Sequence, residues 1–373
     1  MLALAALLGL AAAVPPSSSE MRGLWVVRTG LVSPEAVDRT VDDAARAGFN
    51  ALFAQVRGRC DAFYRSAFAP RSLLLDGQPG TFDPLARLLE RAHARGLQVH
   101  AWVNVLLCAP HTAPLPAGHV LRRRPDFAMA AREIGRPTEA EGIYLSPSAP
   151  GVTPHLEAVV RELVRDYAVD GLHLDFIRYP GPEFDYSAAA LEGFARQQRL
   201  AGGPESPPGD PRAWARYRRD VLTALVTRLG RAARAQRPGI VLSAAVVPDE
   251  AQAVHHRYQD WPAWLEQGLL DAICPMAYTA DRRVFQWQLA SVVSRARRGP
   301  AVWAGIGAYR LSLAGVVGHV RAARGAGALG VILFSHESLA PADAERLRAD
   351  AFGLPAPPVL GGGEAVPGEA SPR

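Results

Sequence analysis

Eight short apolar segments, separated by segments of helix length, constrain the fold of this chain more than any other feature of its sequence. Each segment is a nearly continuous hydrophobic run, as expected for parallel strands that are buried on both faces. The alternation predicts an α/β fold, and eight repeats favour closure into a (β/α)8 TIM barrel over a doubly wound sheet. The expected strands are Gly23–Arg28, Ala51–Arg57, Val99–Asn104, Gly171–Ile177, Val241–Val247, Ala272–Tyr278, Val302–Tyr309 and Gly330–Ser335.

Helix start signals lie between these strands. Ser33-Pro34, for example, places an N-cap residue before a proline at the first helical position. Two connections are much longer than the others and are expected to be mostly loop: 105–143 after the third strand and 181–209 after the fourth. Long loops are commonly functional, and both begin at the carboxyl ends of strands, where barrel enzymes hold their active sites.

The two ends of the chain differ in composition from the part between them. Residues 1–14 form one apolar run, and Ala11 to Ala13 provide an Ala-x-Ala-like cleavage point. This segment, 1–20, resembles a secretory signal peptide and predicts a secreted, periplasmic or envelope protein. It is too short to span a bilayer comfortably, so the mature chain is expected to have no stable membrane span. A single barrel domain is expected over 21–353, followed by a disordered tail over 354–373.

Composition gives little support for a nucleic-acid partner. The 373 residues are 49% hydrophobic, which provides ample core, and carry a formal net charge of +5. All the Lys+Arg residues are Arg, together with heavy Ala, Gly and Pro usage, which indicates codon bias rather than an anionic partner. The sequence contains no compact Arg-rich arm and no recognised nucleic-acid motif.

The chain has three cysteines. Cys274 lies in an apolar strand and is expected in the core. Cys60 and Cys108 each follow a predicted strand by a few residues, so they could form a disulfide on one rim or remain two unrelated thiols.

The stretch from Asp170 to Pro180 is the most informative for function. His173 and Asp175 are two residues apart, so both side chains point to the same side of the expected strand. A carboxylate at the mouth of a barrel is costly unless it is paired or used. Asp175 is therefore either an acid tied to Arg178 or to a neighbouring strand, or a catalytic carboxylate.

Polar and aromatic residues gather at the expected carboxyl ends of all eight strands. Aromatic rings stack on sugar faces, and paired carboxylates perform general-acid and nucleophile chemistry. A metal or other cofactor is not expected, since there is no His-x-His pair and the adjacent His255 and His256 cannot share one face. The residues at these ends include Arg28, Arg57, Trp102, Asn104, Asp175, Arg178, Asp249, Glu250, Tyr278, Asp281, Tyr309, Arg310, His336 and Glu337.

Several of these residues have a structural interpretation as well as a functional one. Arg57 could hold Asp175 ionised or close the barrel top with an ion pair. Trp102 could be a sugar platform or a core residue, and Asn104 could bind a sugar hydroxyl or cap a turn. Tyr278 and Tyr309 could be ligand contacts or packed rim residues. Trp214, Tyr217, Val221, Leu225 and Leu229 recur at helical spacing and predict a core face, with Arg216, Arg218 and Arg219 on a solvated face.

An ordered series of motifs runs between residues 21 and 340. The motifs include Arg22-Gly-Leu-Trp-Val-Val27, Phe53-Ala-Gln-Val-Arg57, His93-Ala-Arg-Gly-Leu-Gln-Val-His-Ala-Trp-Val-Asn104, Tyr144-Leu-Ser-Pro147, Val169-Asp-Gly-Leu-His-Leu-Asp-Phe-Ile-Arg-Tyr-Pro180 and Pro275-Met-Ala-Tyr278. This series resembles the bacterial glycosyl-hydrolase-like family 10. The resemblance implies a glycosidase-like barrel that acts on a bacterial polysaccharide, in some members peptidoglycan glycan strands, and it places Asp175 at the position usually proposed as catalytic. The chain departs from the family where Thr279 follows Tyr278, since many members carry Trp there.

The expected reaction is hydrolysis of a glycosidic bond by two carboxylates. Asp175 would be the nucleophile, or the base in an inverting enzyme, and Asp249 or Glu337 would be the partner acid. Alternatives are a non-catalytic carbohydrate-binding barrel, a metal-dependent polysaccharide hydrolase or deacetylase, and a structural role for the Arg-rich surface. The oligomeric state stays open. The expected substrate-binding residues are Arg57, Trp102, Asn104, His173, Arg178, Tyr278, Tyr309 and His336.

Overall fold

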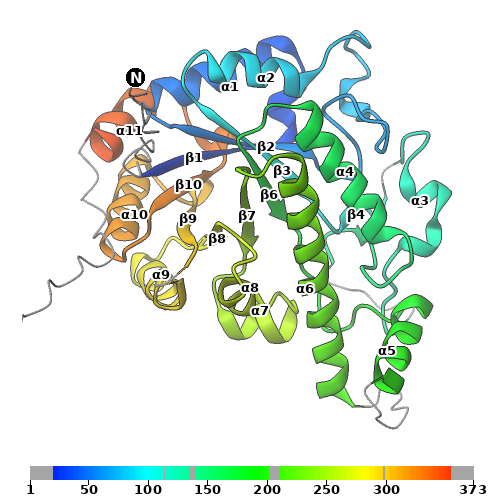
Figure 1. Cartoon of the computed structure of the whole chain (residues 1–373). Helices are drawn as coiled ribbons and strands as arrows, with labels where there is room; N and C mark the ends of the chain where they lie inside the picture. The colour runs from blue at the N-terminus through cyan, green and yellow to red at the C-terminus, as the bar shows by residue number, and fades with distance from the viewer. Residues whose placement is uncertain (1–19, 113, 134–139, 201–209, 297–298, 354–373) are drawn as a thin grey trace, which may run out of the picture.

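A closed barrel of eight parallel strands forms the centre of the chain (Figure 1). The computed structural model describes residues 20–112, 114–133, 140–200, 210–296 and 299–353. Its strand order, β1-β10-β9-β8-β7-β6-β3-β2, confirms the predicted (β/α)8 architecture. The strands are β1 Met21–Val26, β2 Ala51–Arg57, β3 Gln98–Asn104, β6 Gly171–Asp175, β7 Val241–Val246, β8 Ala272–Pro275, β9 Ala301–Gly307 and β10 Gly330–Phe334.

Helices surround the barrel (Figure 1). The Ser33 side chain accepts a hydrogen bond from the backbone N–H of Ala36, which confirms the predicted start of α1. The α-helices are α1 Pro34–Arg46, α2 Pro84–His93, α3 Val120–Arg123, α4 Val152–Asp166, α5 Ala188–Leu200, α6 Pro211–Gln236, α7 Glu250–His256, α8 Trp261–Glu266, α9 Arg282–Ala296, α10 Leu313–Gly325 and α11 Ala344–Leu347. Short 3-10 helices span Arg28–Leu31, Leu73–Leu75, Pro125–Phe127, Ala308–Arg310, His336–Ser338 and Pro341–Asp343, and a π-helical turn spans Arg348–Phe352.

The terminal segments take no part in this description. The expected leader, 1–20, lies outside the described residues except for Glu20, and the expected tail, 354–373, lies outside them entirely. None of the described helices combines the length and the apolar character needed to cross a membrane.

Six of the eight strands end one to three residues earlier than the sequence predicts, and the early ends of β6 and β8 shape the barrel mouth. β6 ends at Asp175 because Phe176 adopts a left-handed conformation, with φ of 49°, which turns the chain out of the sheet. β8 ends at Pro275 because the next amide hydrogens bond locally: the N–H of Ala277 bonds to the carbonyl of Pro275, and that of Tyr278 to the carbonyl of Met276. Residues that follow each break, Phe176 and Arg178 after β6 and Met276 and Tyr278 after β8, line the cavity at the barrel mouth.

The two long connections contain more regular structure than expected. After β3, the antiparallel strands β4 (Leu107–Ala109) and β5 (Ile143–Tyr144) form a small second sheet. After β6, α5 packs on α6, where the Phe194 ring lies 5.0 Å from the Trp214 ring. Burial of these apolar side chains orders segments whose sequence predicts loops.

Helix α6 confirms the predicted core face, but the prediction that Arg218 lies on a solvated face is wrong. Trp214, Leu225 and Leu229 are each buried, whereas Arg218 is not on a solvated face: its side chain is only 4% exposed. The Arg218 guanidinium donates to the carbonyl groups of Pro182 and Phe184 and lies 3.8 Å from the centre of the Tyr258 ring. The residue therefore fixes the loop that follows β6.

The barrel interior holds two uncharged imidazoles. The indole N–H of Trp25 donates to Nε2 of His173 over 3.2 Å, and Nδ1 of His173 lies 2.9 Å from the Ser243 hydroxyl. Burial lowers the pKa of His173 to about 3 and the pKa of His100 to about 4. His100 fits because Gly171 faces it: a Cβ at residue 171 would lie 2.1 Å from its Nδ1.

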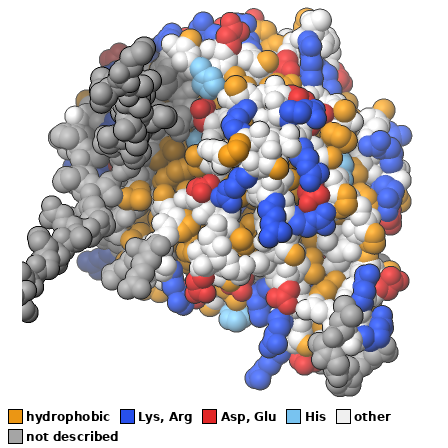
Figure 2. Space-filling view, viewed as in Figure 1, with side chains coloured by type: hydrophobic (Ala, Val, Ile, Leu, Met, Phe, Trp, Pro, Cys, Tyr) orange, Lys and Arg blue, Asp and Glu red, His pale blue; other side chains and the backbone are white. Residues whose placement is uncertain are grey.

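Charges of both signs are interspersed on the face of the molecule that Figure 2 shows. On the face drawn in Figure 2, basic side chains alternate with acidic and hydrophobic ones. This mixture is typical of a solvated protein surface and does not form a single-sign stripe of the kind that binds nucleic acid.

Candidate active site

A cavity of about 570 Å³ opens at the carboxyl ends of the barrel strands. Every strand of the barrel except β9 contributes a residue at or just beyond its carboxyl end. This is the face at which barrel enzymes hold their active sites. The lining residues are Trp25, Val27, Arg28, Thr29, Gln55, Arg59, Trp102, Asn104, Leu107, Glu141, Asp175, Phe176, Arg178, Ala245, Met276, Tyr278 and Phe334.

Asp175 lies in this cavity and is held by three donors. The indole N–H of Trp102 donates to Oδ2 over 3.1 Å, and the backbone N–H of Phe176 donates to Oδ1 over 2.6 Å. Nη1 of Arg178 donates to the same Oδ1 over 3.2 Å. These contacts fix the carboxyl group in one orientation, because the strand break at Phe176 supplies one donor and β3 supplies another.

Burial controls the protonation of Asp175. The residue is 6% exposed, and loss of hydration raises its pKa above the ordinary value. The positive charge of Arg178 and the hydrogen bonds from Phe176 and Trp102 oppose this effect without cancelling it. The carboxyl group thus retains its proton to a higher pH than an exposed aspartic acid, which suits a proton donor.

Glu141 is the other carboxylate among the described residues that line this cavity. Nη2 of Arg178 lies 3.9 Å from its Oε1, so one guanidinium contacts Glu141 and Asp175 together. The Tyr144 hydroxyl donates to Oε2 of Glu141 over 2.5 Å. Sequence reasoning missed Glu141 because it follows no barrel strand. The sequence feature closest to Glu141 in the chain is the family motif that begins at Tyr144.

Aromatic rings form much of the remaining wall. Tyr278 stacks on Phe334, with ring centres 5.4 Å apart, and contacts Trp25 edge-on at 6.2 Å. Trp102 meets the same Phe334 ring at 6.4 Å. Such a wall suits the apolar faces of sugar rings. Trp102 and Tyr278 lie where the sequence predicts contacts, whereas Trp25 and Phe334 were not among the expected site residues.

Arg57 does not contact Asp175. It is fully buried beside the cavity, where its guanidinium donates to the backbone carbonyl of Asn104 and to Sγ of Cys60. Burial lowers its pKa. The sequence-based suggestion that Arg57 holds Asp175 ionised is therefore wrong, since Arg178 is the cation that contacts Asp175. Asn104 does line the cavity, and its side chain donates to the carbonyl of Gly58 over 2.8 Å.

The two expected partner acids are not among the residues that line the cavity with Asp175. Asp249 caps α7, accepting a hydrogen bond from the N–H of Gln252 over 2.7 Å, and lines a different cavity of about 1070 Å³. Glu337 accepts from the hydroxyls of Thr29 and Ser335, over 3.0 and 2.7 Å. Both carboxylates follow strand ends as expected, but each is held by local partners and neither lines the cavity that contains Asp175.

Three further predicted site residues also lie outside the cavity lining. His173 is buried beneath it against Trp25. Tyr309 is 51% exposed, with its ring 6.2 Å from that of Tyr278 at the rim. His336 pairs with Asp43 over 3.0 Å and faces the outer helices.

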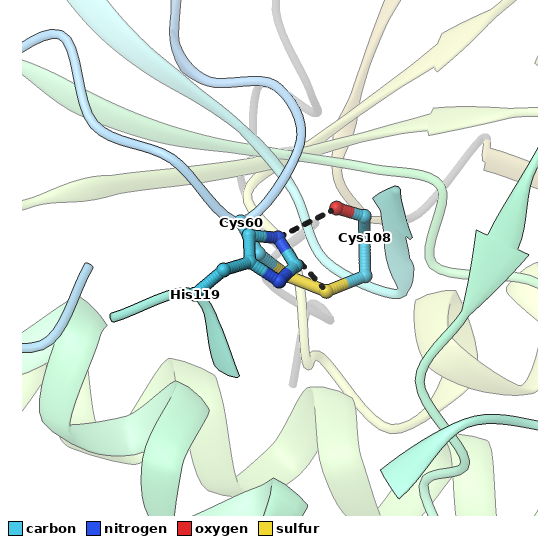
Figure 3. Close-up of side chains that lie close together, drawn as sticks. All are labelled: Cys60, Cys108 and His119. Atoms are coloured by element: carbon cyan, nitrogen blue, oxygen red, sulfur yellow. Dashed lines mark hydrogen bonds between the residues drawn. A yellow bond between two sulfur atoms is a disulfide. The ribbon is translucent and has the colours of Figure 1, made fainter. Parts of the chain in front are cut away.

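Cys60, Cys108 and His119 are the group of described residues whose ligand atoms come close enough to hold a metal ion, all within 4.8 Å (Figure 3). Their contacts indicate that the three side chains hold neighbouring loops together instead. The two cysteines form a disulfide, which settles the alternative left open by the sequence. Nε2 of His119 lies 3.0 Å from the carbonyl of Arg59, and its Nδ1 accepts from the N–H of Leu121. Both imidazole nitrogens therefore have partners.

Removal of this disulfide is expected to lower stability substantially. It joins residues 48 positions apart, and closure of such a loop is worth roughly 4 kcal/mol in the unfolded chain. Urea unfolding of the full chain, with and without dithiothreitol, measures the loss. In the Cys60→Ser/Cys108→Ser variant the reductant should have no further effect. An equal response of the variant and the wild type would contradict this assignment.

The family model described as Glycosyl hydrolase-like 10 matches residues 20–299. Since this match covers more than half of the sequence, the chain belongs to that family.

Two curated relatives support the assignment. The chain is 28% identical over 295 residues to the glycosyl hydrolase YngK of Bacillus subtilis (strain 168), a match that covers 70% of this chain and 54% of the relative. It is 27% identical over 304 residues to the glycosyl hydrolase DigH of Escherichia coli (strain K12), covering 70% of this chain and 66% of that protein. The matched region thus spans about half to two thirds of these relatives.

Solved structures share the fold. The PgaB (BpsB) glycoside hydrolase domain from Bordetella bronchiseptica superposes with a TM-score of 0.69 at 18% identity, over 89% of this chain and 99% of that domain. The catalytic domain of β-amylase from Paenibacillus polymyxa gives a TM-score of 0.65 at 12% identity, over 91% and 100% of the two chains. At these identities the likeness concerns the barrel alone.

Proposed function

We propose that this protein hydrolyses O-glycosidic bonds of a bacterial polysaccharide, with Asp175 and Glu141 as its two carboxylates. The observation that carries the proposal is the shared contact of both carboxylates with Arg178 inside one aromatic-walled cavity. Two carboxylates that flank a bound sugar are the usual requirement for glycoside hydrolysis.

The two carboxylates have different surroundings and therefore different proposed roles. Asp175 is buried with a raised pKa, so it donates its proton to the glycosidic oxygen as the bond to the anomeric carbon breaks. This role differs from the nucleophile or base that the sequence suggested. Glu141 has a side chain 51% exposed beside Arg178. It either takes a proton from an attacking water, which inverts the anomeric centre, or attacks that carbon itself, which retains it.

The proposed substrate is a polysaccharide of the bacterial envelope, and the proposed location is outside the cytoplasm. Membership of the glycosyl hydrolase-like family supports the reaction class, and the apolar segment 1–14 supports export. Glycan strands of the cell wall, both peptide-free and peptide-bearing, are the first substrates to test, because the family resemblance implies peptidoglycan glycan strands in some members.

The test incubates the full chain with peptide-free and peptide-bearing glycan strands and analyses released fragments by mass spectrometry. Glu141→Gln is expected to reduce fragment release by about 100-fold or more. Asp249→Asn serves as the matched control, since this carboxylate caps α7 and lines another cavity. It should retain activity well below its unfolding temperature.

Release of equal amounts by wild type and Glu141→Gln would remove Glu141 from the mechanism. Saturable binding of the strands without any released fragment would support the alternative of a non-catalytic carbohydrate-binding barrel.

A further inference from the structure

Two arginines that form no ion pair with any described residue stand at one wall of the cavity. Arg28 follows β1, and Arg59 follows β2. Both line the cavity that contains Asp175, and both also line an adjoining groove of about 290 Å³ together with Asp61, Leu73, Leu74 and other residues. The two arginines therefore lie where the groove meets the cavity.

Neither guanidinium forms an ion pair with any residue that the structure describes. Nη1 of Arg28 donates to the side-chain oxygen of Gln55 over 3.3 Å. Nε and Nη1 of Arg59 are buried and have no hydrogen-bond partner. Asp61 lies nearby, but it accepts from the backbone N–H of Arg59 over 2.8 Å and forms no salt bridge with either side chain.

The positions of these groups are fixed by the barrel. Gln55 on β2 contacts Arg28 with its oxygen and donates to the side chain of Asn104 on β3 over 3.3 Å. Asn104 in turn donates to the carbonyl of Gly58. Arg28 lies against this glycine: a Cβ at residue 58 would be 3.2 Å from its Cδ. The chain thus leaves room at residue 58 for the arginine.

Two adjacent guanidinium groups with unpaired N–H donors raise the free energy of the folded protein, and a bound anion would reduce this cost. Burial and the charge of Arg59 both lower the pKa of Arg28, with Asp61 opposing them in part. Buried donors without partners cost free energy, and an oxyanion would satisfy several of them through charge-assisted hydrogen bonds.

We infer that Arg28 and Arg59 form a subsite for a carboxylate carried by a sugar of the substrate. The substrate class is then an acidic polysaccharide, which runs along the groove and places a charged sugar close to the bond at Asp175. This inference rests on the proposed function and narrows it. The carboxylate belongs either to a uronic acid or to a lactyl ether on an amino sugar, which share the same recognition chemistry.

The experiment measures binding by the full chain rather than cleavage. Peptide-free glycan strands carry lactyl carboxylates, and polygalacturonate carries uronate carboxylates. Each polymer is compared with its own carboxyl-reduced form, in which the carboxylate is an alcohol. We expect the preferred intact polymer to bind at least about tenfold more tightly than its reduced form, with the difference shrinking as salt is added.

Variants test whether the two arginines cause this preference. Arg28→Gln and Arg59→Gln should each weaken binding of the intact polymer about tenfold and leave the reduced polymer unaffected. Gly58→Ala should act in the same direction by displacing Arg28. Arg231→Gln is the matched control, because Arg231 is exposed on α6 and lines neither cavity.

The outcomes separate this inference from the proposed function. Equal binding of intact and reduced polymers, no binding of either intact polymer, or a preference that survives Arg28→Gln/Arg59→Gln would each overturn the carboxylate subsite. Cleavage of reduced polymer at the rate of intact polymer would also overturn it while the hydrolase stands. Arginine-dependent binding without cleavage would support the subsite and contradict hydrolysis.

Discussion

Asp175→Asn is expected to lower the rate of glycan cleavage by about 10² to 10⁴-fold while glycan binding changes little. The amide keeps the size of the side chain and can still accept hydrogen bonds, but it has no carboxyl proton to give to the leaving oxygen. Single-turnover release of fragments measures the rate, and isothermal titration with the same strands measures affinity.

The pH profile gives this prediction an independent test. Because the protonated acid is the working form, the rate should fall as the pH rises through the pKa of Asp175, which burial raises. Trp102→Phe removes an N–H that stabilises the charged form, so the alkaline limb should move to higher pH. Fragment release by Asp175→Asn at the wild-type rate would exclude Asp175 as the acid.

Stability is expected to fall steeply between neutral pH and pH 5 because of His100 and His173. Their folded pKa values, about 4 and about 3, lie below the value of 6.5 for a free imidazole. Above pH 6.5 both imidazoles are largely neutral in the folded and in the unfolded chain, so they do not reduce the free energy of unfolding. As the pH falls, the unfolded chain takes up protons that the folded barrel cannot accept. The loss at pH 5 is about 2 kcal/mol for each residue, or about 4 kcal/mol together.

Urea unfolding at pH 7 and pH 5 measures this loss. His173→Gln should reduce the pH dependence by about a third, because His155, whose pKa burial also lowers to about 4, contributes beside His100. Gln can still accept the hydrogen bond from Trp25 without titrating. His255→Gln, on an exposed part of α7, should leave it unchanged. An unaltered pH dependence in His173→Gln would mean that this imidazole does not titrate differently in the two states.

Much of the barrel follows from local sequence. Parallel strands are buried on both faces, so their segments must be apolar, and their order along the chain appears directly in the sequence. The same logic places Asp175, Trp102 and Tyr278 at the mouth, because carboxyl ends of parallel strands converge there. Strand ends were less accurate, since the left-handed conformation of Phe176 has no signal in residue type.

The identity of the second carboxylate depends on tertiary structure. Asp249 and Glu337 follow strands and were reasonable partners, but Asp249 caps α7, Glu337 accepts from two hydroxyls, and neither lines the cavity of Asp175. Glu141 lies in the long connection between β3 and β6. The pairing of β5 with β4 brings this part of the connection to the cavity. No local pattern encodes such a return, because contacts between segments far apart in sequence determine it.

The sequence by itself determined the eight-stranded barrel, the face with the polar and aromatic strand ends, and the place of Asp175 near the end of the fourth strand. Only the tertiary structure decided that Cys60 joins Cys108, that Arg178 rather than Arg57 contacts Asp175, and that Arg218 is buried. The physical reason is that each segment carries its own hydrophobic pattern, which predicts the side that is buried. The partner of a charge or a thiol depends instead on which segments meet in space.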